Sequence, residues 1–182
     1  DVNTEKGTFT AIDIDGTYAS GLEGEPQLLV ERKMIAIPFG ATPVVNIKSY
    51  TEEVYNLNDF GMHRVFPRQP SVSKSTKPED IRFAYKESAY AQKGFVENEI
   101  ANIEISGNVR GVRFGFINVR PIVYDASTNT IKVRNNIELE VTFKNANPYE
   151  TQHLFEATYS PYFINFYNSL FNKDIYDEHP DL

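Results

Sequence analysis

Apolar and polar side chains alternate strictly along residues 131–143. The apolar positions of one parity are Ile131, Val133, Ile137, Leu139, Val141 and Phe143, and the polar positions between them are Lys132, Arg134, Asn136, Glu138, Glu140 and Thr142. Successive side chains of a β-strand point to opposite faces of a sheet. The alternation therefore predicts a long strand with one face on a core and one in water.

The residues before this strand are also typical of strands. Gly107-Asn108 separates the apolar positions of 100–105 from a strand-like stretch at 109–124, which predicts a hairpin. The apolar parity slips near Ile117, which indicates a bulge. A turn-forming stretch at 125–129 leads into the long strand. Together, residues 95–143 predict a three-stranded antiparallel meander.

The first half of the chain has shorter strand-like stretches. They lie at 8–14, 28–37, 43–50 and 53–57, and glycine, proline and asparagine separate them. Many short strands joined by such turns favour antiparallel sheets over an alternating α/β chain. We therefore expect an all-β fold, an antiparallel β-sandwich of the jelly-roll type.

Two segments depart from the strand pattern. Residues 67–93 contain Pro67, Pro70 and Pro78 and predict a long loop, and loops of more than about 12–15 residues are usually functional or disordered. Ser160 can cap a helix that begins at Pro161. The aromatic and leucine spacing that follows predicts one C-terminal amphipathic helix over about 161–171. The last residues, 174–182, are predicted to form an exposed acidic segment.

Composition excludes several classes of function. The 182 residues carry a net charge of −7, which disfavours nucleic-acid binding through a basic face. With no cysteine there is no thiol nucleophile and no cysteine-based zinc site. His63, His153 and His179 are scattered, which favours packing or surface roles over catalysis. No apolar run approaches the roughly 20 residues that span a bilayer.

One motif suggests an enzyme. Asp13-Ile14-Asp15-Gly16-Thr17 matches the D-x-D-G-T signature of haloacid-dehalogenase-type phosphatases. That chemistry requires a doubly wound α/β frame, and no alternation of strand and helix follows Thr17. Asp-Gly is also a common hairpin turn, so a turn is the preferred interpretation.

The many aromatic residues allow a different function. The chain has 13 Phe and 11 Tyr but no Trp, the usual sugar-stacking residue. Most of the aromatic residues fall at core positions, which favours packing. A non-catalytic cell-surface binding or adhesion module, for carbohydrate among other ligands, is an alternative.

Two lysines stand at positions where a protease would act. Lys74 lies between Pro70 and Pro78, and prolines lower the entropic cost of presenting a loop in an extended form. A long cation at the centre of such a loop suits an acidic protease specificity pocket. Lys173 follows the predicted helix and precedes the acidic segment, where a lysine-specific enzyme would cut.

Several stretches resemble the N-terminal propeptides of gingipains, the Arg- and Lys-specific cysteine proteases of oral Bacteroidetes. They include Gln69-Pro70-Ser71-Val72-Ser73-Lys74-Ser75, and the others lie at 32–45, 109–113, 132–138, 160–163 and 170–174. The resemblance covers nearly the whole chain in order. Within the family it is greatest to the lysine-specific branch.

The resemblance implies an inhibitory β-sandwich domain over residues 1–173 that keeps a secreted protease latent and assists its folding. Lys74 matches the residue that enters the S1 pocket, on a loop with Ser71, Val72, Ser73 and Ser75. Lys173 and Asp174 match the processing site, so residues 174–182 would begin the mature protease.

The resemblance also sets the expected partner and place. The partner is the catalytic domain of the cognate gingipain-type protease. The chain itself is expected to hold no catalytic residue, metal or cofactor. The parent protein would be a secreted virulence factor of a Gram-negative bacterium, passing from the periplasm to the outer-membrane surface after signal-peptide removal.

Overall fold

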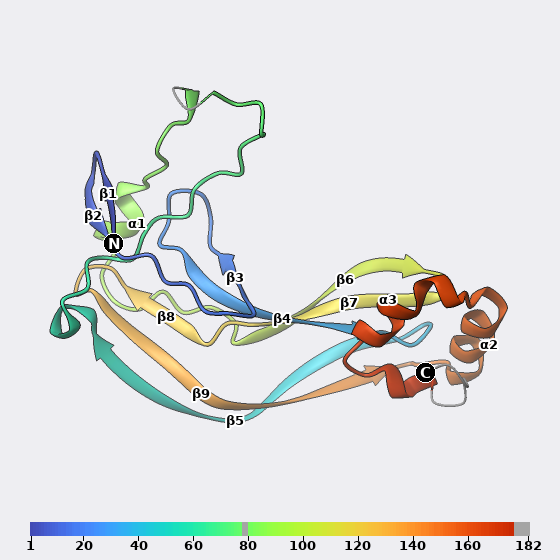
Figure 1. Cartoon of the computed structure of the whole chain (residues 1–182). Coiled ribbons are helices and arrows are strands. Elements are labelled where there is room, and N and C mark those ends of the chain that lie inside the picture. The colour runs from blue at the N-terminus through green and yellow to red at the C-terminus, as the bar shows by residue number, and fades with distance from the viewer. Residues whose placement is uncertain (78–79, 177–182) are drawn as a thin grey trace. The chain divides into compact units, whose positions relative to one another are not determined.

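The computed structural model describes residues 1–77 and 80–176, and most of its regular structure is antiparallel sheet (Figure 1). The strands are β1 (Val2–Thr4), β2 (Gly7–Phe9), β3 (Thr17–Ser20), β4 (Leu28–Ala36), β5 (Thr42–Asn56), β6 (Ala101–Val109), β7 (Val112–Val119), β8 (Ile122–Asp125) and β9 (Thr130–Lys144). The helices are α1 (Glu87–Ala91), α2 (Pro148–Thr158) and α3 (Ile164–Ser169), with 3₁₀ turns η1 (Leu57–Phe60), η3 (Pro161–Phe163) and η4 (Lys173–Tyr176). The expected all-β antiparallel fold is confirmed.

The strands form sheets in an order that differs from the predicted meander. One sheet has the order β3-β4-β7-β6, another has β5-β9-β8, and β1 and β2 form a hairpin. The strands of residues 95–143 are thus shared between two sheets, so the three-stranded meander was wrong. Pro121 lies between β7 and β8, and proline cannot donate a ladder hydrogen bond. The break there ends the first hairpin, β6-β7, before the second, β8-β9, begins.

Several boundaries differ from those predicted. The stretches 43–50 and 53–57 form one continuous strand, β5, and residues 11–14 are irregular. The β6-β7 turn falls at Arg110 and Gly111, both with positive φ, rather than at Gly107-Asn108. Such a pair suits the twist of a tight hairpin. The bulge lies in β6, between Ile105 and Gly107, instead of near Ile117.

The chain folds into two compact units. Unit 1 comprises Asp1–Val30, Tyr50–Glu99 and Arg120–Ile137, and unit 2 comprises Glu31–Ser49, Ile100–Val119 and the described part of Glu138–Leu182. Strands β4, β5 and β9 contribute residues to both units. Among the described residues, no helix is long and apolar enough to cross a membrane.

In unit 2, the β4-β7 pair is covered on both faces. Ile35, Ile37 and Ile117 pack against apolar residues of β9, whereas Ala36 and Val112 pack against the C-terminal helices. A strand buried on both faces is expected to be continuously apolar, as residues 34–37 are. Gly115 permits this packing, since a Cβ there would lie 2.4 Å from the carbonyl oxygen of Glu104.

The C-terminal part of unit 2 contains more helix than the sequence analysis predicted. The expected helix at about 161–171 is η3 followed by α3, which ends at Ser169. Most of its predicted apolar face packs in the core, but Phe171 is exposed. Helix α2 was missed. Its signal is the sequence Asn147-Pro148, where the Asn147 side chain accepts a hydrogen bond from the backbone N–H of Glu150 at 3.1 Å.

Unit 1 has its own core, centred on Phe9. Aromatic rings of Phe66, Phe83, Tyr85 and Tyr90 surround it with ring centroids about 6 Å away. The Tyr90 hydroxyl donates to the carbonyl oxygen of Val65 at 2.7 Å. The hydroxyl of Tyr124 accepts from the Val65 N–H at 3.2 Å, and burial raises its pKa to about 12. Packing and hydrogen bonds therefore both hold Val65 and Tyr90 in the core of unit 1.

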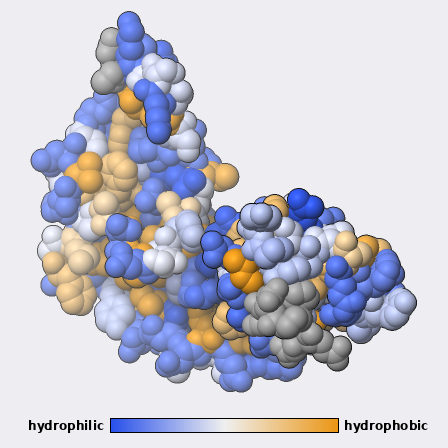
Figure 2. All heavy atoms as spheres, turned by 45° about the vertical axis from the view of Figure 1, so that its right-hand side comes forward, coloured by the Kyte–Doolittle hydropathy of each residue, from blue (hydrophilic) through white to orange (hydrophobic). Residues whose placement is uncertain are grey.

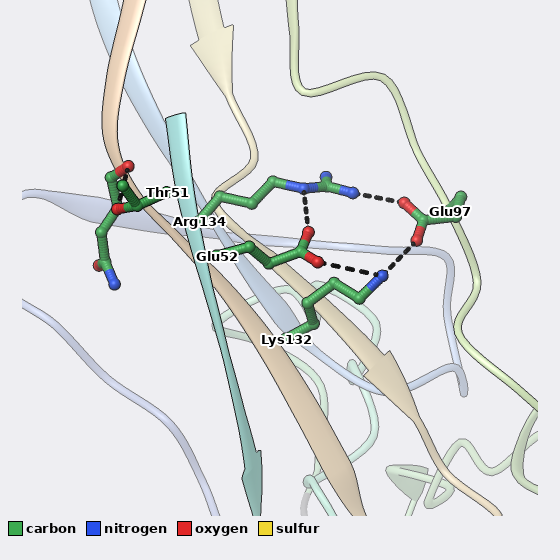
Figure 3. A network of polar contacts seen from close by, with 6 residues as sticks. Thr51, Glu52, Glu97, Lys132 and Arg134 are labelled. Carbon is green, nitrogen blue, oxygen red and sulfur yellow. Dashed lines mark hydrogen bonds and ion pairs between the residues drawn. The ribbon is translucent and has the colours of Figure 1, made fainter. Parts of the chain in front are cut away.

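A charged network holds the irregular segment 92–99 against β9 in unit 1 (Figure 3). Glu97 pairs with Lys132 at 3.1 Å and with Arg134, and Glu52 of β5 lies 3.5 Å from each of these two cations. The hydrogen bond from Lys132 lowers the pKa of Glu97. Because this segment covers the polar side of β9, Arg134 is buried although it lies at a polar position of the alternating pattern.

Candidate functional site

The Lys74 loop, defined here as residues 70–83, is closed at its base by the side chain of Gln69. The Gln69 amide donates to the carbonyl oxygens of Pro67 at 2.9 Å and Ala84 at 3.0 Å. Its Oε1 accepts from the Ala84 N–H at 2.9 Å. One amide side chain thus satisfies both backbone groups of Ala84, which fixes the distance between the two ends of the loop.

Both arms of the loop are anchored in unit 1. On the outgoing arm, Arg68 exchanges backbone hydrogen bonds with residues 24 and 25, and its guanidinium donates to the carbonyl oxygen of Ala19 at 2.9 Å. On the returning arm, Phe83 packs on Phe9 and Phe66 in the aromatic core. The loop therefore begins and ends on a buried platform, as a functional loop on a rigid scaffold does.

Beyond the arms, the loop is open. Figure 1 shows it in green, leading away from the strands of unit 1, and Figure 2 shows the projecting region at the top as mainly hydrophilic. The side chains of the predicted inhibitory loop are exposed, namely those of Ser71, Val72, Ser73, Lys74 and Ser75. Val72, at 49% exposure, is the apolar side chain among them.

Lys74 lies at the apex of a turn. The Thr76 N–H donates to the Ser73 carbonyl oxygen at 3.0 Å, and the Ser75 N–H donates to the Ser73 hydroxyl at 3.3 Å. This leaves Lys74 at a central position of a four-residue turn. Within residues 1–77 and 80–176, its ammonium group makes no hydrogen bond or ion pair. The cation is presented to solvent, on a turn that must open before the chain can lie extended in a cleft.

The second predicted site lies in a different environment. Residues 170–176, called the processing segment here, contain Lys173 and Asp174 within the turn η4. The Lys173 ammonium donates to Asn168 Oδ1 at 3.0 Å, and its side chain is partly buried. The predicted exposure is confirmed at Asp174 and corrected at the next two residues, since Ile175 packs in the core of unit 2 and Tyr176 is buried there. Residues 177–182 lie outside the described residues.

The other candidates of the sequence analysis have structural explanations. Asp13 and Asp15 are exposed on an irregular segment, and Thr17 closes a turn onto Ile14, in agreement with the turn interpretation. Among the residues described, no group of acidic or histidine side chains is placed to hold a metal ion. His63 lies 3.4 Å from Asp1, His153 stacks on Tyr149, and His179 lies outside the described residues.

Two residues that shape these sites were missed from the sequence. Gln69 closes the Lys74 loop, and Asn172 bonds to both backbone groups of Ala36 in the unit 2 core. Both are single amides whose partners lie far away in the chain or across a loop, and periodicity carries no signal for such contacts. Their positions beside Lys74 and Lys173 in the sequence are the available clue.

Comparisons with known proteins show the family to which this chain belongs. The chain matches the family described as Propeptide_C25 over residues 1–172. It is 49% identical over 181 residues to Lys-gingipain HG66 of Porphyromonas gingivalis and 48% identical to Lys-gingipain W83 of the same species. In each case the alignment covers 100% of this chain and 10% of the relative, so the chain spans about a tenth of the length of these curated relatives.

Two solved structures are similar in fold to this chain. A structure described as giving insight into the zymogenic latency of gingipain K from Porphyromonas gingivalis matches with a TM-score of 0.75 and 48% identity, over 80% of each chain. A complex of Porphyromonas gingivalis RgpB pro- and mature domains matches with a TM-score of 0.72 over 95% of this chain and 85% of the other. At 21% identity it shows the fold alone. The chain is a member of the Propeptide_C25 family, the non-catalytic propeptides of gingipains.

Proposed function

We propose that this chain keeps a gingipain-type, lysine-specific cysteine protease latent by placing Lys74 in the S1 pocket of the catalytic domain, and that it assists the folding of that domain. The observation that carries the proposal is an exposed cation at the apex of a loop whose base is fixed, with no hydrogen-bond or ion-pair partner among residues 1–77 and 80–176. The family membership and the latency described for gingipain K make a protease catalytic domain the natural partner.

The Lys74 loop suits inhibition because its cost of binding is low. Gln69 and the aromatic packing of Phe83 hold the two ends of the loop, so these ends do not have to be ordered on binding. Ordering fewer residues on binding leaves more of the contact energy as affinity. A lysine ammonium facing an acidic pocket forms charge-assisted hydrogen bonds. Within the described part of the chain, Lys74 forms no ion pair that would compete with such a pocket.

The test is inhibition in trans by the full 182-residue chain. We expect Lys74→Ala to weaken inhibition of a lysine-specific gingipain catalytic domain by at least about tenfold, because removing one partner of a buried charge pair costs about 2–5 kcal/mol. Lys77→Ala is the matched control, since Lys77 is an exposed lysine of the same loop. An unchanged inhibition constant for Lys74→Ala would exclude Lys74 from the mechanism. Glycan binding without inhibition would favour the adhesion alternative.

We also propose that maturation cuts the Lys173–Asp174 bond, so that residues from Asp174 onward begin the mature protease, and that the parent protein is secreted. We expect Lys173→Ala to slow maturation of the precursor without unfolding this domain. N-terminal sequencing of the mature enzyme checks the assignment, and a first residue other than Asp174 would contradict it. Refolding of the catalytic domain with and without this chain tests the folding role.

A further inference from the structure

The processing segment is bonded to β4 on one side of its lysine. The Phe171 N–H donates to the carbonyl oxygen of Met34 at 2.8 Å. The Asn172 side chain accepts from the Ala36 N–H at 2.8 Å and donates to the Ala36 carbonyl oxygen at 3.0 Å. The residue just before Lys173 therefore satisfies both backbone groups of a fully buried alanine, in the way a neighbouring strand would.

On the other side of the lysine, Tyr176 fills the core of unit 2. Its side chain is 1% exposed, and its ring stacks on Phe155 of α2 with centroids 4.3 Å apart. Phe155 is itself completely buried, and Leu170, at the start of the segment, is 2% exposed. The bond after Lys173 thus lies between two buried anchors, Leu170 and Tyr176.

The bond itself lies in a compact turn. The backbone N–H groups of Lys173 and Ile175 donate to the carbonyl oxygens of Leu170 and Asn172, each at 3.3 Å. Proteases bind the chain around the scissile bond as an extended strand, which this turn does not provide. Cleavage requires the turn to unwind and Tyr176 to leave its site. The rate is then set by the population of the opened form.

We infer that the processing segment is a latch: Asn172 and Tyr176 shield the Lys173–Asp174 bond in the folded chain, and hydrolysis there also removes Tyr176 from the core of unit 2. Hydrolysis adds water across the bond, leaving a carboxylate on Lys173 and an amine on Asp174. The cut would then weaken unit 2 as it frees the downstream chain. The role of this latch in maturation rests on the proposed function, whereas the shielding of the Lys173–Asp174 bond does not.

The experiment uses the folded 182-residue chain and a lysine-specific endopeptidase of an unrelated family, with new chain ends followed by mass spectrometry. Lys93–Gly94 is the internal reference, because Lys93 is exposed on an irregular segment. A synthetic peptide of residues 168–179 gives the rate of the Lys173 cut without the fold. We expect the Lys173 cut in the folded chain to be at least about 100-fold slower than in the peptide, as for a bond that needs local opening of a core element.

Two variants assign the shielding to its residues. We expect Tyr176→Ala and Asn172→Ala each to speed the Lys173 cut by at least about tenfold and to leave the Lys93 cut unchanged, because each removes an anchor of the closed form. Tyr162→Ala, at a tyrosine that is 95% exposed, is the matched control. Hydrogen exchange at the Ala36 amide, which donates to Asn172, reports opening directly. If Tyr176→Ala does not fold, Asn172→Ala and the exchange data decide.

Two results overturn the latch. One is a Lys173 cut in the folded chain as fast as in the peptide. The other is a slow cut that neither variant accelerates, which would place the cause outside these anchors. Since the protease is unrelated to the proposed partner, either result leaves inhibition through Lys74 standing. Conversely, a mature N-terminus other than Asp174 refutes the processing assignment and leaves the measured shielding intact.

Discussion

The two lysines of interest lie in opposite environments. Lys74 is exposed at the apex of a turn in unit 1 and has no bonded partner among the described residues, whereas Lys173 is partly buried in unit 2 and bonded to Asn168. The Lys74 loop is fixed at its base and free at its tip. The processing segment is fixed on both sides of its lysine. The two roles that we propose, entry of Lys74 into a protease pocket and cleavage after Lys173, have different structural needs.

The difference shows how one chain can present two lysines to a lysine-specific enzyme in different ways. Exposure and a preformed base favour binding at Lys74. At Lys173, burial of the flanking residues makes access depend on local unfolding. The comparison therefore depends on the residues that hold each segment in place, and substitutions of three such residues test it.

The largest effect is expected at Tyr176. Tyr176→Ala removes a large, completely buried ring that stacks on Phe155, and such truncations cost about 3–5 kcal/mol. Urea unfolding followed by near-UV circular dichroism measures the loss. Tyr162→Ala should change the free energy of unfolding by no more than about 0.5 kcal/mol, since that side chain lies in solvent. A loss of similar size for both variants would mean that Tyr176 is not an anchor.

A smaller effect is expected at the base of the Lys74 loop. Gln69→Ala leaves the N–H and C=O of Ala84 without their partner, which costs about 1–2 kcal/mol. If a fixed base is what makes Lys74 effective, inhibition weakens by a factor of about 5–30. Gln152→Ala is the control, because Gln152 donates to Glu156 of the same helix, α2, at the surface. Full inhibition by Gln69→Ala would show that the loop binds without a fixed base.

Local pattern was enough to predict the strands and the loop. The alternation of 131–143 places β9, and the apolar residues at 28–30 and 34–37 place β4, because burial on one or both faces leaves a direct trace in the sequence. The position of Lys74 between prolines identified the exposed loop. These features depend on neighbours in the chain, which a single sequence records.

Features that depend on distant partners were not predictable in this way. Three such features join residues far apart in the chain. They are the change of sheet at Pro121, the burial of Arg134 under segment 92–99 and the docking of Tyr176 on Phe155. Residues 174–176 read as exposed because Asp174 is charged, yet the two apolar residues after it are inserted into a core. Composition predicted that these two residues are exposed, but packing against other elements places them in the core.

The smallest effect distinguishes anchoring by charge from anchoring by burial. Glu97 holds segment 92–99 through Lys132 and Arg134, and the pKa of Glu97 is lowered in the folded chain. A lowered carboxyl pKa contributes stability above the unfolded value, here 4.5, that is lost as the pH falls through the folded value. Glu97 is about half exposed, so solvent limits this contribution to about 0.5 kcal/mol.

Glu97→Gln should therefore lower the free energy of unfolding by about 0.5 kcal/mol at neutral pH, and the difference from wild type should shrink as the pH falls below 4.5. The matched control is Glu99→Gln, an exposed carboxylate on the same segment. Over the same range the cost of Tyr176→Ala should stay constant, since neither the phenol nor Phe155 titrates in acid. A Glu97 effect that does not shrink as the pH falls below 4.5 would mean that packing, rather than charge, holds this segment. The comparison would then be between exposed residues such as Lys74 and residues held by packing, with no separate class held by charge.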